Sequence, residues 1–139
     1  MVSKSKPAIF ISHAAKDSQF ARALSDALEK RGFGAGYVRL ARTEEPVQKE
    51  LTRALEQASV YLFLVSDDAV RSSWMFFELG AALGKGKAVL PVYFSESAWR
   101  RARSFLPSIS AEVRPINAHD LKPAEVADKV VEALETVAA

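Results

Sequence analysis

One segment of the chain, residues 60–65, is hydrophobic at every position. It reads Val-Tyr-Leu-Phe-Leu-Val and runs into the polar stretch 66–73. A strand with one solvated face alternates apolar and polar residues, whereas a parallel strand covered by helices on both faces is apolar throughout. The run therefore predicts a central parallel strand in an α/β domain.

The rest of the chain alternates between strand-like and helix-like patterns. Four further segments are short, apolar and bounded by turn residues, which predicts strands at 8–12, 35–40, 88–94 and 112–116. Pro91 and Pro115 lack a backbone donor, which is typical of edge positions. Gly32 predicts the end of a first helix that begins near residue 18, and Asp120 predicts the cap of the last helix. The other helices are predicted at 47–58, at 74–83 and around Trp99.

This alternation predicts a single flavodoxin-like domain over residues 8–139, after a short tail at 1–7. We expect about five parallel strands in the order 2-1-3-4-5, with helices on both faces. In that order the chain reverses direction across the sheet between strands one and three, and ligands bind outside the carboxyl ends of these strands. The loops that begin at Ser12 and Ser66 should therefore meet at this crevice.

Composition excludes several classes of protein. The sequence has no cysteine, which excludes disulfides, thiolate metal sites and cysteine nucleophiles. His13 and His119 lie far apart, so no metal site is expected. Only Arg100, Arg101 and Arg103 form a tight basic cluster within a net charge of +2, which does not indicate direct binding to nucleic acid. No segment has the pattern of a membrane span or a signal peptide, and we expect a cytoplasmic protein.

Glu78 is the only ionisable residue between Trp74 and Gly84. A carboxylate in an apolar helix is costly unless it is paired, exposed or functional. Trp74 precedes it by four residues, so the two side chains share one helix face. Two interpretations stay open on physical grounds. The pair forms a ligand wall beside the crevice, or Glu78 makes a surface ion pair while Trp74 fills a groove between helices.

Several motifs, in register with the predicted elements, resemble bacterial TIR (Toll/interleukin-1 receptor) domains. They cover residues 8 to about 95: Phe10 to Asp17, Val65-Ser66, Ser73-Trp74, Glu78-Leu79-Gly80, Lys87 and Val89 to Val92. The resemblance implies that Glu78, in Trp74-x-x-x-Glu78, is the catalytic glutamate of NAD-cleaving members. The implied reaction cleaves the nicotinamide–ribose bond of NAD⁺, the substrate, to nicotinamide and ADP-ribose or a cyclic isomer. No cofactor is implied.

Weaker predictions concern the other substrate contacts. Ser12, His13 and Ser66 lie in the loops expected at the crevice, and Arg42 is a candidate anion contact. Each has a plainer alternative: His13 as a surface or turn residue, Arg42 as a solvated charge, and the neighbouring Lys16-Asp17 as a charge pair at a helix start. The loop 41–46 departs from the family pattern because it lacks a Pro-Gly pair.

The resemblance also implies activation by self-association with other TIR domains, with a filament as one form of assembly, and a role in bacterial defence or signalling. A sensor domain or partner protein is a further expected partner. The main alternative is a non-catalytic TIR module that recruits other TIR domains. A phosphoacceptor receiver domain is disfavoured because only Asp67 and Asp68 lie near its expected acidic positions. A flavodoxin is disfavoured because the first loop lacks a phosphate cradle.

Overall fold

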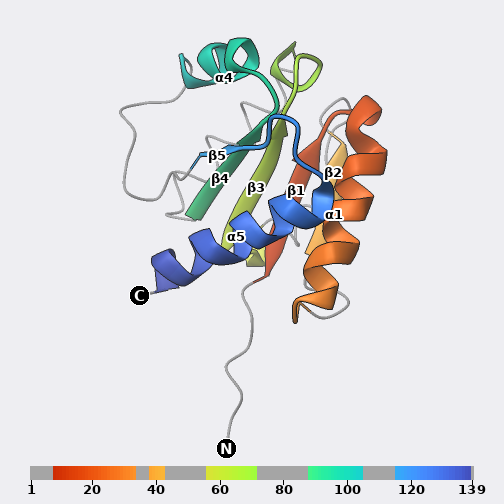
Figure 1. Cartoon of the computed structure of the whole chain (residues 1–139), viewed down its shortest axis with the longest axis vertical. Coiled ribbons are helices and arrows are strands. Elements are labelled where there is room, and N and C mark those ends of the chain that lie inside the picture. The colour runs from red at the N-terminus through yellow and green to blue at the C-terminus, as the bar shows by residue number, and fades with distance from the viewer. Residues whose placement is uncertain (1–7, 34–37, 43–55, 72–87, 105–114, 139) are drawn as a thin grey trace, which may run out of the picture.

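The computed structural model describes residues 8–33, 38–42, 56–71, 88–104 and 115–138. These residues form a parallel sheet with helices packed on both faces (Figure 1). No helix in this part of the chain is long and apolar enough to cross a membrane. The elements, in chain order, are β1 (Ile9–His13), η1 (Ala15–Asp17), α1 (Ser18–Lys30), β2 (Val38–Arg42), β3 (Val60–Val65), η2 (Ala69–Arg71), β4 (Ala88–Tyr93), α4 (Glu96–Arg103), β5 (Ile116–Asn117) and α5 (Pro123–Ala138).

The five described strands lie in the order β2-β1-β3-β4-β5, and every pair is parallel. This confirms the predicted flavodoxin-like order. β3 lies at the centre and all six of its residues are buried, as its continuous apolar sequence predicted. In the register, Ile11 of β1 lies between Leu40 of β2 and Leu62 of β3.

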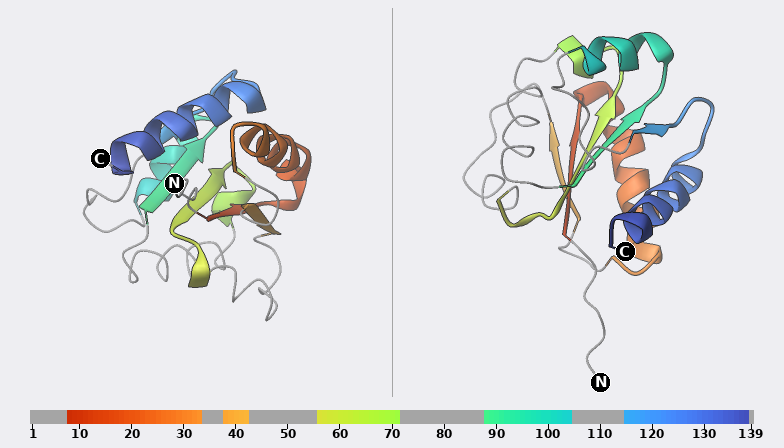
Figure 2. Two further views of the ribbon diagram at one scale, coloured as in Figure 1. Left: turned by 90° about the horizontal axis from the view of Figure 1, so that it is seen from below. Right: turned by 90° about the vertical axis from the view of Figure 1, so that its left-hand side faces the viewer.

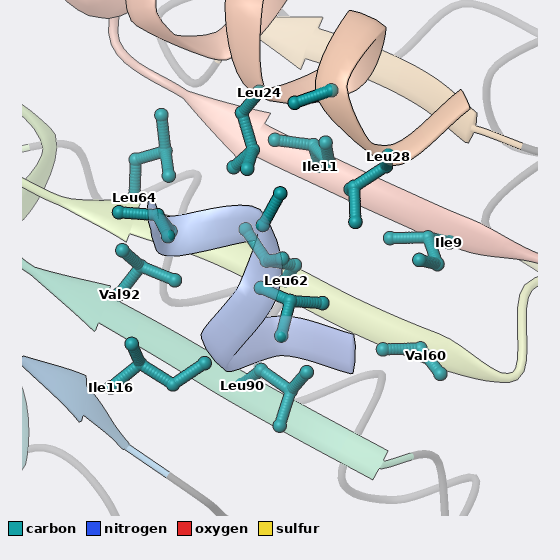
Figure 3. Close-up of a cluster of buried hydrophobic side chains, with 14 of the residues drawn as sticks. Ile9, Ile11, Leu24, Leu28, Val60, Leu62, Leu64, Leu90, Val92 and Ile116 are labelled. Atoms are coloured by element: carbon teal, nitrogen blue, oxygen red, sulfur yellow. The ribbon is translucent and has the colours of Figure 1, made fainter. Parts of the chain in front are cut away.

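The two faces of the sheet bury separate hydrophobic clusters, because successive side chains of a strand point to opposite faces. Ile9 and Ile11 of β1 belong to the first cluster, which lies under α1 and α5 (Figure 3). Phe10 belongs to the second cluster, which η2 and α4 cover near the carboxyl ends of β3 and β4 (Figure 2). A side chain at the end of a strand can therefore contribute to a site on only one of the two faces of the sheet.

Helix α1 ends at the glycine that the sequence predicted. Gly32 has a φ of 102°, in the left-handed region where a side chain is disfavoured. Its N–H donates to the carbonyl of Glu29, and the N–H of Phe33 donates to the carbonyl of Leu28. These two bonds form a Schellman motif, and Phe33 is buried in the first cluster beside the helix end.

Pro91 lies within β4, and the sheet accommodates it. The N–H of Ala88 donates to the carbonyl of Ser59 on the β3 side. Because successive N–H groups of a strand alternate between its two neighbours, the nitrogen of Pro91, three residues later, faces β5 instead. β5 pairs with β4 only from Val92 onward, so Pro91 removes no bond from the described ladder.

Other predicted boundaries differ from the structure. Asp120 does not cap the last helix: it adopts a φ of 60° in the preceding turn. The cap is at Lys122, whose N–H donates to Glu125 Oε1 at 3.0 Å, with Pro123 at the first helical position. The final strand is Ile116–Asn117 rather than 112–116. The predicted helices at 47–58, apart from its last residues, and at 74–83 lie outside the described residues.

Candidate active site

The loops that follow β1 and β3 meet at the carboxyl edge of the sheet, as predicted. The hydroxyl of Ser66 donates to Asp17 Oδ2 at 2.5 Å, and the N–H of Ala69 donates to the same hydroxyl at 3.2 Å. One side chain therefore starts the η2 turn and binds the loop of the neighbouring strand. We call this region, formed by residues 12–17 and 66–71, the switch-point edge.

An ion-pair network reinforces the switch-point edge. Lys16 Nζ lies 3.8 Å from Asp68 Oδ2, and an Arg71 guanidinium nitrogen lies 3.7 Å from Asp68 Oδ1. Asp17 makes no side-chain cap bond to α1. Lys16 and Asp17 do lie at the start of α1, with Asp17 at its N-cap position, and the side chains of both also bind the β3 loop.

Ser12 and His13 both lie inside β1 and are buried, with exposed fractions of 0% and 4%. His13 is therefore not a surface residue. Its Nδ1 lies 2.9 Å from the carbonyl of Ala14, which can only accept, so Nδ1 carries the proton. By strand alternation, His13 lies on the face of Ile11 and Ser12 on the face of Phe10. The two candidates thus serve opposite faces of the sheet.

Arg42 is the last residue of β2 and lies opposite His13 in the parallel register. The sequence placed it at the start of a loop, but pairing with β1 extends the strand through this position. Its backbone therefore belongs to the same carboxyl edge as Ser12 and Ser66. The structure brings together the ends of three adjacent strands, which is the arrangement that the strand order requires at a switch point.

Trp74 and Glu78 lie outside the described residues. The described chain fixes where their segment begins and ends: it leaves η2 after Arg71 and enters β4 at Ala88. Ala69 and Val70 of η2 are buried in the second cluster. The crossover that carries Trp74 and Glu78 therefore begins on the face of the sheet that Phe10 and Ser12 share.

A separate open pocket of about 390 Å³ lies at the ends of β4 and β5, and the sequence did not predict it. Its lining consists of Ser95, Glu96, Asn117 and His119. His119 Nδ1 lies 3.2 Å from Asp120 Oδ2, a partner that the sequence had not indicated. Among the described residues, no three histidine, aspartate or glutamate side chains are arranged to hold a metal ion.

The backbone N–H of Ala118 donates to the carbonyl of Tyr93 and joins the two sides of this pocket, but the side-chain hydrogen bonds of its lining residues stay within individual turns. Ser95 Oγ accepts from the N–H of Ala98 at 3.2 Å and caps α4, and Asn117 Oδ1 accepts from the N–H of His119 at 3.0 Å. At the end of β4, Tyr93 stacks on Trp99 with ring centroids 5.2 Å apart. Burial raises the pKa of Tyr93 above its usual value of 10.0, and the nearby charge of Glu96 raises it further.

The comparisons with known proteins agree with this architecture. Two solved structures share the fold: a de novo designed Rossmann 2x3 protein and a putative pilus assembly-related protein from Burkholderia pseudomallei. The designed protein has a TM-score of 0.55 at 18% identity, with 93% of this chain and 90% of that chain covered. The Burkholderia protein has a TM-score of 0.51 at 16% identity, with 96% and 93% covered. At such identities the likeness concerns the fold alone.

Family membership rests on the sequence. No curated protein gives a significant match to the chain. The sequence model of the TIR domain family, in contrast, matches residues 9–135, which is nearly the whole length. The match spans all five described strands and includes both Trp74 and Glu78. The chain therefore belongs to the TIR domain family.

Proposed function

We propose that this TIR domain cleaves NAD⁺ between nicotinamide and ribose, with Glu78 as the catalytic carboxylate. One observation carries the proposal: Trp74-x-x-x-Glu78 lies within the family match, in the crossover that leaves the switch-point edge. Ligands of doubly wound sheets bind at this edge. An isolated carboxylate in an otherwise uncharged stretch of sequence is explained by a role in chemistry at such an edge.

The reaction needs little from the protein beyond one well-placed carboxylate. Positive charge develops at the anomeric carbon as the bond to nicotinamide breaks, and a fixed carboxylate stabilises this charge and accepts hydrogen bonds from ribose hydroxyls. Nicotinamide leaves as a neutral molecule without prior protonation. Water then adds at the anomeric carbon and gives ADP-ribose, or an adenine nitrogen attacks and gives a cyclic isomer.

The candidate site residues divide into two roles. Ser12 and His13 are buried, and the hydroxyl proton of Ser66 is used in the bond to Asp17. We assign these three residues to the framework that shapes the site. Direct contacts with NAD⁺ then belong to Trp74 and Glu78, with Arg42 as the candidate partner of a substrate phosphate.

We expect activity to depend on association between copies, and we propose, from the same family resemblance, a role in cytosolic signalling or defence in bacteria. The test is nicotinamide release from NAD⁺ at high protein concentration, with and without a fused oligomerising domain. Glu78→Gln keeps the size of the side chain and removes its charge. Glu29→Gln, at an exposed position on α1, makes the same chemical change away from the edge and serves as the matched control.

We expect turnover in the wild type and in Glu29→Gln, and a loss of at least about 100-fold in Glu78→Gln. A folded wild type that releases no nicotinamide in any assembled state would contradict the proposal. That result would support the alternative, a TIR module that recruits other TIR domains without catalysis. Equal turnover in both variants would leave an enzyme whose catalytic carboxylate is not Glu78.

A further inference from the structure

The outer surface of α4 is strongly basic. Arg100, Arg101 and Arg103 are all exposed, and Glu96 is the only acidic residue of the helix. Within the described chain none of these arginines forms an ion pair, whereas Arg31 and Arg71 do. Helix η2, which carries Arg71, packs beside α4 (Figure 2). A surface with three guanidinium groups that form no ion pair with any described residue fits a partner with several carboxylates.

The same chain carries an acidic surface of matching size on α5. Glu125, Asp128, Glu132 and Glu135 are exposed and follow one another at intervals of three, four and three residues. This spacing places them in one stripe along the helix. Lys129 is the only basic residue within α5. At a rise of 1.5 Å per residue, the stripe is about 15 Å long and α4 is about 12 Å long.

The two surfaces cannot meet within one molecule. Trp99 of α4 is buried in the second cluster, and Val126 and Val130 of α5 are buried in the first, so the sheet lies between the two helices. A basic surface on one side of a molecule and an acidic stripe on the other can pair only between copies. Such a contact is heterologous, because the two copies contribute different patches, and it can repeat in an open chain.

We infer that α4 of one copy docks through Arg100, Arg101 and Arg103 onto the acidic stripe of α5 of a second copy. The inference concerns assembly and stands without the proposed NAD⁺ cleavage. If both hold, the head-to-tail contact supplies the association on which activity depends. Neither surface includes Ser12, Ser66 or Glu78, so the variants in α4 and α5 keep these residues of the proposed site in the sequence.

The test measures association by analytical ultracentrifugation over a range of protein concentrations. The first variant, Arg100→Glu/Arg103→Glu, reverses two charges of α4. The second, Glu132→Arg/Glu135→Arg, reverses two charges of α5 and avoids Glu125, which caps the helix, and Asp128, which pairs with Arg31. The control, Arg22→Glu/Lys30→Glu, makes the same net change as the first variant at exposed positions of α1.

We expect the wild type and the control to associate, with a Kd that rises about tenfold or more between about 0.05 M and 0.5 M salt. Each reversed variant alone should associate at least about tenfold more weakly. An equimolar mixture of the two reversed variants should associate again, because the unchanged α4 of the second variant meets the unchanged α5 of the first, and the two reversed surfaces are also complementary. Recovery in the mixture shows that the contact joins α4 of one copy to α5 of another, and the helix content of each variant, measured by circular dichroism, distinguishes a lost contact from a misfolded helix.

Three results would overturn the inference. One is a wild type that stays monomeric at low salt. This result would overturn the inference even if the same arginines bound an RNA oligonucleotide. Another is a control that weakens as much as the α4 variant. The third is a mixture of folded reversed variants that does not associate. Association that the charge reversals weaken as expected, but without nicotinamide release, would contradict only the proposed enzyme activity. Nicotinamide release by a protein that stays monomeric would contradict only the proposed assembly.

Discussion

The switch-point edge and the pocket at the ends of β4 and β5 use similar residues in different ways. At the switch-point edge, Ser66 and Asp17 are bonded although 49 residues separate them in sequence. At the β4–β5 pocket, Ser95 and Asn117 bond to backbone groups only two or three residues away. The first set of bonds joins two loops, whereas the second set shapes individual turns.

This difference bears on function. An active site requires groups held within a fraction of an ångström, and bonds between elements restrict relative motion better than bonds within one turn. The switch-point edge has such bonds at the position where doubly wound sheets bind ligands. The β4–β5 pocket is more open to solvent but has no described side-chain bond between its two loops.

The largest effect on stability should come from Ser66→Ala. The substitution removes the donor to Asp17 and the acceptor for the Ala69 N–H, in a half-buried setting. We expect the free energy of unfolding to fall by about 1–3 kcal/mol, measured by urea denaturation. A double-mutant cycle with Asp17→Asn should give a coupling energy of about 1 kcal/mol. Strictly additive losses would show that the two loops are not joined by this bond.

Ser95→Ala should cost less, because it removes one local cap of α4. We expect a loss of about 1 kcal/mol in the same urea assay, and Ser95→Asp should restore most of it by capping the same N–H group. The variant should not couple to Asn117→Ala, since no described side-chain hydrogen bond joins the two turns. A coupling energy as large as that between Ser66 and Asp17 would remove the contrast between the two regions.

Lys16→Ala should have a smaller effect still. The Lys16 side chain is 81% exposed and its ammonium lies 3.8 Å from Asp68, so solvent screens the pair. We expect a change of about 0.5 kcal/mol or less, and this difference should vanish in high salt. A loss of the size expected for Ser66→Ala would mean that the ion pairs, rather than the Ser66 bond, hold the edge together.

The smallest effect concerns pH at the β4–β5 side. The pKa of Tyr93 is raised by burial and then by Glu96, so the folded protein holds this phenolic proton more tightly than the unfolded chain. The resulting stability is present below pH 10 and is lost as the pH rises through the folded pKa. Tyrosinate absorbance should show one group, absent in Tyr93→Phe, that titrates above the normal range. In Glu96→Gln its pKa should fall only in part, and a complete return to the normal value would show that burial is not the main cause.

The sequence predicted the parts of the molecule that depend on hydrophobic period and on single conformational demands. The continuous apolar run at 60–65 placed β3 at the centre of the sheet, and the resulting strand order placed the loops after Ser12 and Ser66 side by side. Gly32 marked the end of α1 because its position requires a positive φ. These signals are local in sequence, or follow from connection rules that hold across α/β folds.

What the sequence missed depends on contacts between distant segments. His13 was expected in a loop, but pairing with Arg42 keeps it in β1. Asp120 had the side chain of a helix cap, yet Glu125 satisfies the backbone at Lys122 instead. The β4–β5 pocket joins residues about 20 positions apart that match no motif. Trp74 and Glu78 lie outside the described residues, so their roles rest on the sequence and on the family match.

The most direct test compares two glutamates, one assigned to each region. Nicotinamide release from NAD⁺ by the assembled protein should be measured for Glu78→Gln and for Glu96→Gln, whose glutamate lines the β4–β5 pocket. We expect Glu78→Gln to lower kcat/KM by at least about 100-fold and Glu96→Gln to stay within about twofold of the wild type. Full activity in folded Glu78→Gln, or a loss confined to Glu96→Gln, would contradict the assignment of the chemistry to the switch-point edge.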